Sequence, residues 1–121
     1  MSLNNYTLLD TTIYGEASGN YDGSSQDFHG DPVIAADYYR GYGGLQSVRY
    51  RLNDFVGIIY VEATLDPTAI DANWFTTLEI GDGSTVESVD RSQSVIGNFT
   101  WMRVRVANFT AGIIDSITLT Y

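Results

Sequence analysis

Hydrophobic and polar positions alternate along much of this chain with the period of two that is typical of β-strands, not with the longer period of helices. The clearest case is the sequence WMRVRV at residues 101–106, where the apolar side chains occupy the even positions. Such alternation places one face of a strand in a core and the other face toward solvent. The pattern therefore predicts an all-β protein.

Residues 95–121 are expected to form a closing β-hairpin. Two alternating runs flank a candidate turn that lies between Asn108 and Gly112, residue types that are common in turns. Placing Ala107 opposite Gly112 aligns the apolar faces of the two runs. Asp115 then falls on the apolar face, which indicates a bulge, a carboxylate with a partner, or a register shifted by one residue.

Further strand candidates precede this hairpin. Residues 45–52 alternate regularly, and Asn53 and Asp54 predict a turn after them. The longest apolar stretch, residues 55–65, is expected to be a central strand, with a bulge or a close backbone contact at Gly57. Less regular candidates are residues 6–13, 33–36, 74–80 and 85–91, with one helical turn at 68–73. About seven to nine short strands with frequent turn residues predict an antiparallel β-sandwich of jelly-roll type.

The composition changes within the chain, but its length suits one domain. Residues 15–44 hold seven of the 12 Gly. We expect residues 1–44 to form an N-terminal strand followed by a Gly/Tyr-rich arm or set of loops, and residues 45–121 to form the sandwich core. An arm would lie on a partner subunit, whereas loops would cover the domain's own sheet; the sequence favours neither.

The chain carries 15 acidic and six basic residues, for a net charge of -9, and every basic residue is Arg. This excess of negative charge disfavours nucleic acids and anionic membranes as partners. Four of the Arg form two R-x-R pairs, Arg49 with Arg51 and Arg103 with Arg105, each on one strand face. We expect these pairs to contact acidic side chains of this protein or of a neighbour.

The sequence offers little for catalysis or metal binding. There is no Cys, which excludes disulfides and thiolate sites. The lone His29 lies between Asp27 and Asp31, and without a second His it is better explained as a surface residue than as a ligand or base. The loop at Asp22 resembles part of a calcium loop but lacks carboxylates at the required ends, and residues 81–83 are explained by a turn. We expect no enzyme, no cofactor and no metal.

Aromatic side chains are the stronger candidates for a function. Trp74 and Trp101 would serve either as a platform for sugar rings or as anchors between subunits. Tyrosines of the Gly/Tyr-rich segment offer amphipathic contact area. Arg103 and Arg105 lie on the same strand face as Trp101, the face expected to point outward. The candidate binding residues are therefore Tyr38, Tyr39, Tyr42, Trp74, Trp101, Arg103 and Arg105.

Three segments of the second half form a recognisable set: FVGIIYVEATL at 55–65, DANWF at 71–75 after Pro67, and GNFTWMRVRVANFTAGIIDSITL at 97–119. Together they resemble small virion proteins of tailed bacteriophages, over a little more than half of the chain. The resemblance implies a compact β-sandwich subunit that decorates heads, necks or tails and brings no catalytic residue. The sequence at 101–106 is also similar to the closing strands of galactose-binding-like carbohydrate-binding modules.

We therefore expect a capsid decoration or other exterior accessory subunit of a virion. Its partners would be other capsid or tail subunits and copies of itself. The N-terminus does not resemble a signal peptide, so we expect synthesis in the host cytoplasm. The alternative is a carbohydrate-binding module that attaches to host surface glycan. Trp74 and Trp101 distinguish the two, because open rings beside polar groups favour sugar and rings covered by another chain favour assembly.

Overall fold

The computed structural model describes residues 5–36 and 44–121. The described residues form strands but no helix, so the helical turn expected at 68–73 is wrong. No helix among them is long and apolar enough to cross a membrane. The strands are β1 (Asn5–Leu9), β2 (Thr12–Ile13), β3 (Phe28–His29), β4 (Val33–Ile34), β5 (Leu45–Thr64), β6 (Phe75–Ile80), β7 (Glu87–Ile96) and β8 (Trp101–Thr120).

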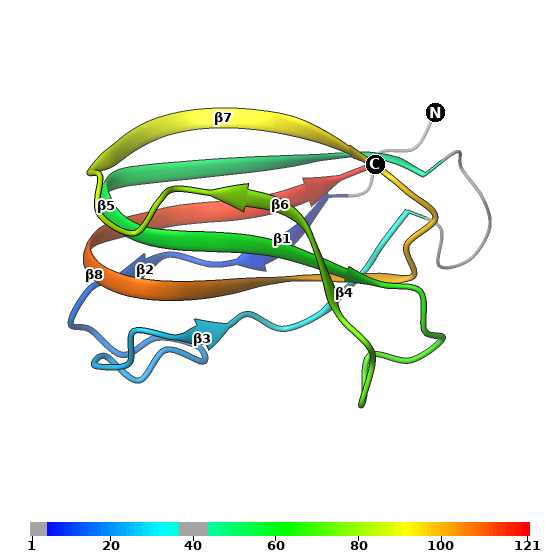
Figure 1. Ribbon diagram of the computed structural model, residues 1–121, viewed down its shortest axis with the longest axis horizontal. Helices are drawn as coiled ribbons and strands as arrows, with labels where there is room; N and C mark the ends of the chain where they lie inside the picture. Colours follow the sequence, from blue (N-terminus) through cyan, green and yellow to red (C-terminus); the bar gives the residue numbers. More distant parts are fainter. Residues whose placement is uncertain (1–4, 37–43) are drawn as a thin grey trace.

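All eight strands belong to one antiparallel sheet, which confirms the all-β prediction for the described part of the chain. The strands are not all short, however, because β5 and β8 have 20 residues each. These two strands pair with each other from Ser47 and Thr120 to Thr64 and Trp101. Both bend sharply near their middle, at the left of Figure 1, so the sheet folds over on itself.

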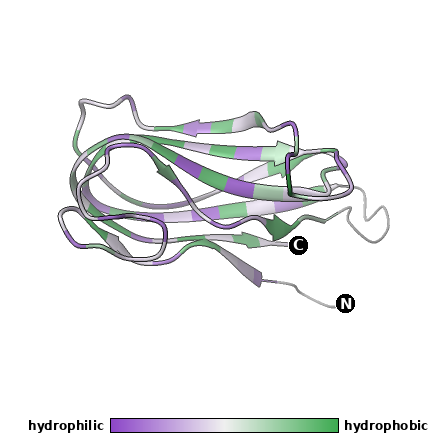
Figure 2. Ribbon diagram, turned by 90° about the horizontal axis from the view of Figure 1, so that it is seen from below, coloured by the Kyte–Doolittle hydropathy of each residue, from purple (hydrophilic) through white to green (hydrophobic). Residues whose placement is uncertain are grey.

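The bend divides the sheet into two layers. One layer contains the first half of β5 beside β7 and the second half of β8 beside β1 and β2. The other contains the second half of β5 beside β6 and the first half of β8 beside β3 and β4. Figure 2 shows hydrophobic and hydrophilic residues alternating along the long strands, as expected when each layer has one face in the core.

The turns predicted at residues 53–54 and 108–112 are wrong, because both lie inside continuous strands. The backbone turns there through positive φ values at Asp54 (53°), Asn108 (54°) and Gly112 (92°). The pairing of β5 with β8 shifts register in the same region. Asn, Asp and Gly favour such backbone in a bulge as well as in a hairpin turn. The two candidate turns instead lie side by side and bend two paired strands together.

The expected hairpin at 95–121 is therefore absent, since its two halves pair with β5 and not with each other. Ala107 lies opposite Ile58 rather than Gly112. Asp115 has no cross-strand partner in β5, because the residues on either side of it pair with two consecutive residues of that strand. A bulge thus accounts for Asp115, which confirms one of the three explanations expected for this residue.

The strand β7 continues to Ile96, past the strand end expected at residue 91.

The bend reverses which residues of β5 face the core. An extra residue in a strand sends every later side chain to the opposite face, so the alternation persists on both sides of the break but changes parity. The buried apolar residues of β5 are even-numbered before the bend and odd-numbered after it: Val48, Tyr50, Leu52, then Phe55, Ile59, Val61 and Ala63.

Aromatic rings fill the core beside the bend. Phe109 stacks on Phe55 with ring centroids 5.6 Å apart. Tyr21 and Phe28 pack on the same Phe109 ring at 5.3 and 5.9 Å. The described part of the Gly/Tyr-rich segment therefore contributes two rings to the core, and its strands β3 and β4 pair with β8.

Gly112 offers a test of the paired bends. A Cβ at this position would overlap the carbonyl group of Asp54 and lie 2.6 Å from the Cα of Phe55, whereas a Cβ on Gly15, at a similar φ of 89°, would meet nothing within 4 Å. We expect Gly15→Ala to cost about 1–2 kcal/mol of unfolding free energy from backbone strain, and Gly112→Ala to cost more than about 3 kcal/mol. Urea unfolding of both variants measures the difference. Equal losses would show that the strands do not constrain each other at the bend.

Candidate functional site

Most described candidate residues lie on the outer surface of the layer that contains β6. Tyr60 pairs with Arg105, and Glu62 with Arg103, across the boundary between β5 and β8. Trp74 immediately precedes β6. We call this surface the Arg-aromatic face; it consists of Tyr60, Glu62, Trp74, Trp101, Arg103 and Arg105.

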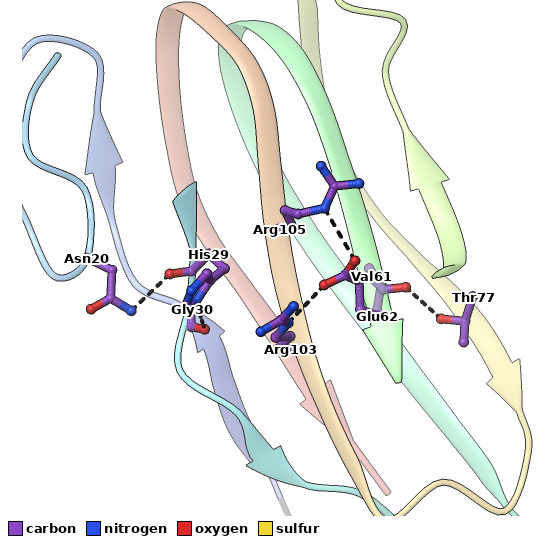
Figure 3. Close-up of polar contacts among 8 residues, drawn as sticks. All are labelled: Asn20, His29, Gly30, Val61, Glu62, Thr77, Arg103 and Arg105. Carbon is purple, nitrogen blue, oxygen red and sulfur yellow. Dashed lines mark hydrogen bonds and ion pairs between the residues drawn. The ribbon is translucent and has the colours of Figure 1, made fainter. Parts of the chain in front are cut away.

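Glu62 is the centre of the Arg-aromatic face (Figure 3). Its Oε1 accepts a hydrogen bond from Nε of Arg103 at 2.8 Å, and its Oε2 accepts one from Nε of Arg105 at 3.3 Å. The Glu62 side chain is only 9% exposed, against 20% for Arg103 and 40% for Arg105. The prediction that an R-x-R pair contacts an acidic side chain of this protein is confirmed.

Both guanidinium groups also lie on aromatic rings. Arg103 lies over the ring of Trp74 at 4.4 Å, and Arg105 lies over the ring of Tyr60 at 4.2 Å. Each contact attracts the cation to the negative face of the ring. These two ring contacts and the hydrogen bonds to Glu62 hold the side chains of Arg103 and Arg105 in place, although such long side chains otherwise change rotamer freely.

The two Trp residues are both partly buried. One face of the Trp74 ring is covered by Arg103. The indole Nε1 of Trp101 donates a hydrogen bond to the carbonyl oxygen of Pro67 at 3.3 Å. The two rings are thus held by other parts of the same chain.

The second R-x-R pair repeats this arrangement in a more exposed place. Arg49 donates from Nε and Nη2 to the two carboxylate oxygens of Asp90, at 2.9 and 2.8 Å, and Arg51 lies 3.7 Å from the same carboxylate. About half of each side chain is exposed. The hydrogen bonds from Arg49 lower the pKa of Asp90. In both clusters two Arg share one carboxylate of a neighbouring strand.

His29 contributes no metal cluster. It is exposed, and its Nδ1 lies 3.2 Å from the carbonyl oxygen of Gly30 (Figure 3). Its own carbonyl oxygen accepts a hydrogen bond from the side-chain amide of Asn20 at 2.9 Å. No group of three or more potential ligands is positioned to hold a metal ion within residues 5–36 and 44–121.

Two loops with the sequence D-G-S use their Asp to close a turn. Asp22 accepts hydrogen bonds from the backbone N–H groups of Ser24 and Ser25 at 2.8 and 2.7 Å. Asp82 is bonded in the same way to the two residues that follow Gly83, at 2.9 and 2.7 Å. Hydrogen bonds from the backbone and from the hydroxyl of Ser25 lower the pKa of Asp22 to about 2. Hydrogen bonds from the hydroxyl and the backbone of Thr85 lower the pKa of Asp82. The turn interpretation explains both loops.

Shallow depressions occur elsewhere on the surface. One of about 200 Å³ lies between β6 and β7, with Arg91 and Glu87 among its lining residues. Two others, of about 170 and 180 Å³, lie beside β1 and the loop after it. No residue of the Arg-aromatic face lines any of these three depressions.

The structure brings four of the seven predicted binding residues onto one face, while Tyr38, Tyr39 and Tyr42 lie outside the described residues. Sequence reasoning missed Tyr60 and Glu62. A usable signal was present, because Glu62 is the only charged residue within the apolar stretch 55–65. No protein family model, curated protein or solved structure matches this chain.

Neutralising Glu62 tests how strongly the face is held together. Glu62→Gln keeps the shape but leaves two guanidinium groups without their shared counter-charge. We expect a loss of about 2 kcal/mol of unfolding free energy, less than the ~3–5 kcal/mol of a fully buried pair because Arg105 stays in contact with water. Asp90→Asn makes the same change in the exposed cluster and should barely move the urea midpoint. Equal shifts would contradict a role for burial.

Asp22 gives a prediction for acid stability. Its pKa in the folded protein, about 2, is below the ordinary value of 3.8. Its contribution to stability is therefore complete above about pH 4 and is lost as the pH falls through about 2. Asp22→Asn does not titrate, so the gap in urea midpoint between wild type and variant should be largest at neutral pH and close towards pH 2. A gap that stays constant with pH would contradict this.

Proposed function

We propose that this protein is an exterior structural subunit of a tailed-phage particle, either a capsid decoration or another accessory subunit. In this proposal the folded-over sheet is a jelly-roll-like β-sandwich that acts by contact and performs no catalysis. The source of the particle assignment is the resemblance of residues 55–121 to small virion proteins. The observation that carries the binding role is the Arg-aromatic face.

The Arg-aromatic face has the composition of a protein interface. Trp, Tyr and Arg are enriched in the centres of such interfaces, whereas Lys is depleted, and this chain has no Lys. The guanidinium groups of Arg103 and Arg105 are already held by Glu62 and by aromatic rings. A partner that binds here would immobilise few additional rotamers, which reduces the entropy cost of association.

Exposed apolar side chains at one end of the molecule support the same proposal. The start of β5, the end of β7 and the segment between β5 and β6 all lie at the end opposite the bend (Figure 1). These segments and the adjoining first residue of β6 carry five large apolar side chains that are between 41% and 81% exposed. We call them the apolar end: Leu45, Leu65, Ile70, Phe75 and Ile96. Grouped exposed apolar residues are typical of contact surfaces.

The contacts of Trp74 favour a protein partner over a glycan. A sugar stacks on an open ring face, and the guanidinium of Arg103 occupies one of the two faces of Trp74 at 4.4 Å, which leaves at most the other face for a sugar. Trp101 is additionally tied to Pro67 through its indole nitrogen. A carbohydrate-binding module remains the competing outcome in the experiment below.

The test is to purify intact particles from the host that produces this chain and to identify their proteins by mass spectrometry. We expect the chain in the particles and accessible to labelling from outside. Added back to particles that lack the chain, Arg105→Ala should bind at least about tenfold more weakly than wild type, because it removes a side chain from the Arg-aromatic face.

Arg49→Ala is the matched control, since it removes one exposed, ion-paired Arg from the other layer and should bind like wild type. Absence of the chain from purified particles, together with a positive signal on a glycan array, would overturn the proposal in favour of carbohydrate binding. Equal weakening by both variants would show that overall charge, not the Arg-aromatic face, determines attachment.

A further inference from the structure

The strand β7 borders the sheet with one side unpaired. It pairs only with β5, and no strand among residues 5–36 and 44–121 pairs with its other side. Figure 1 shows β7 as a long, smoothly curved ribbon along the edge of its layer. An edge of this kind presents a row of backbone N–H and C=O groups that another strand can pair with.

The usual protections of an edge strand are weak in β7. Proteins shield edges with Pro, Lys, bulges or very short strands. β7 has ten residues, neither Pro nor Lys, and an unbroken register with β5 from Ile96 to Val89. β7 shifts register only beside its first residue, between Val89 and Glu87, whereas the much shorter β1 and β6 shift register within five and six residues, and β3 and β4 have two residues each.

The pairing with β5 determines which backbone groups of β7 are available. Gly97 donates its N–H to the carbonyl oxygen of Gly44 at 3.0 Å, and this pair continues the register of the two strands. In antiparallel strands such hydrogen-bonded pairs alternate with non-hydrogen-bonded pairs. The odd-numbered residues from Val89 to Val95 therefore bond to β5. The even-numbered residues, centred on Ser92, direct their N–H and C=O groups to the free side.

We propose that β7 is a dimerisation edge, at which two copies of this chain pair antiparallel about a two-fold axis at Ser92. The sheet would then continue from one subunit into the other. This goes beyond the proposed function, because it concerns the isolated protein whether or not it belongs to a particle.

The side chains of β7 select this register. A two-fold axis at Asp90 or Arg91 would place like charges directly opposite each other, which is unfavourable. An axis at Gln93 or Ser94 would leave fewer residues of β7 paired. The axis at Ser92 uses nearly the whole strand and opposes no like charges: its pairs are Ser92 with Ser92, Asp90 with Ser94, Arg91 with Gln93, and Val89 with Val95.

The charge of Arg91, on the core side of β7, would make the dimer reversible. Arg91 of each copy would be a diagonal neighbour of Arg91 of the other copy, which weakens the contact. Glu87 lines the same depression as Arg91, on the core side of the strand, and supplies opposite charge nearby. An inward-pointing charge of this kind also keeps a free edge from indiscriminate pairing.

A cysteine variant tests the register directly. The chain has no Cys, so Ser92→Cys introduces a single thiol, and hydrogen-bonded pairs bring Cα atoms to about 5.5 Å, within disulfide range. Ser94→Cys is the matched control on the same outward row. Its two copies would be about four residues, or roughly 14 Å, apart. Under mild oxidation we expect a covalent dimer of Ser92→Cys and not of Ser94→Cys. Equal cross-linking of both, or none of Ser92→Cys, would overturn the proposal.

Sedimentation equilibrium of the full chain tests the backbone hydrogen bonds. Ser92→Pro removes an N–H that faces the free side, so it spares the pairing with β5; Ser92→Ala keeps this donor. We expect a concentration-dependent dimer for wild type and Ser92→Ala, and a dissociation constant raised at least about tenfold for Ser92→Pro. A monomeric wild type at all concentrations would overturn the proposal. Circular dichroism checks that Ser92→Pro folds, and if it does not, the cysteine pair decides.

Discussion

The fold depends on two strands that bend together. β5 and β8 stay paired over almost their entire length while the sheet turns back on itself, so neither strand can bend without the other. The contact between Gly112 and the backbone of Asp54 is so close that no side chain fits between them. Positive φ values on both strands supply the curvature that regular strands lack. Because every other strand pairs with β5 or β8, the positions of both layers follow from this single bend.

The same bend determines what the surface presents. After the bulge, β5 has its odd residues in the core and its even residues outside, which places Glu62 between Arg103 and Arg105. Without the parity change, a hydrophobic row would face solvent and Glu62 would enter the core. The core and the Arg-aromatic face are therefore two results of one backbone feature. A substitution that alters the bend is expected to disturb the face even though the two are separated along the strands.

Much of this arrangement was predictable from local pattern, and the two wrong turn predictions have one cause. The period of two correctly identified strands, and each R-x-R pair has an acidic partner within the chain. The turns at 53–54 and 108–112 were wrong because Asn, Asp and Gly permit positive φ in both a turn and a bulge. Only pairing between segments some 50 residues apart decides whether a strand ends or continues, and local sequence does not contain it. For the same reason the partner of Arg103 was missed: its place as the one charge in the apolar stretch 55–65 marks Glu62 as unusual, but only strand pairing places it beside Arg103.

The edge of β7 and the Arg-aromatic face suit different kinds of contact. The edge of β7 is self-complementary and therefore fits a two-fold contact between identical subunits. The Arg-aromatic face, on the other layer, presents aromatic rings and two Arg that share one carboxylate. This composition suits contact with a different protein. Taken together, the two proposals describe a dimer formed through β7 that would attach to a larger assembly through the Arg-aromatic face.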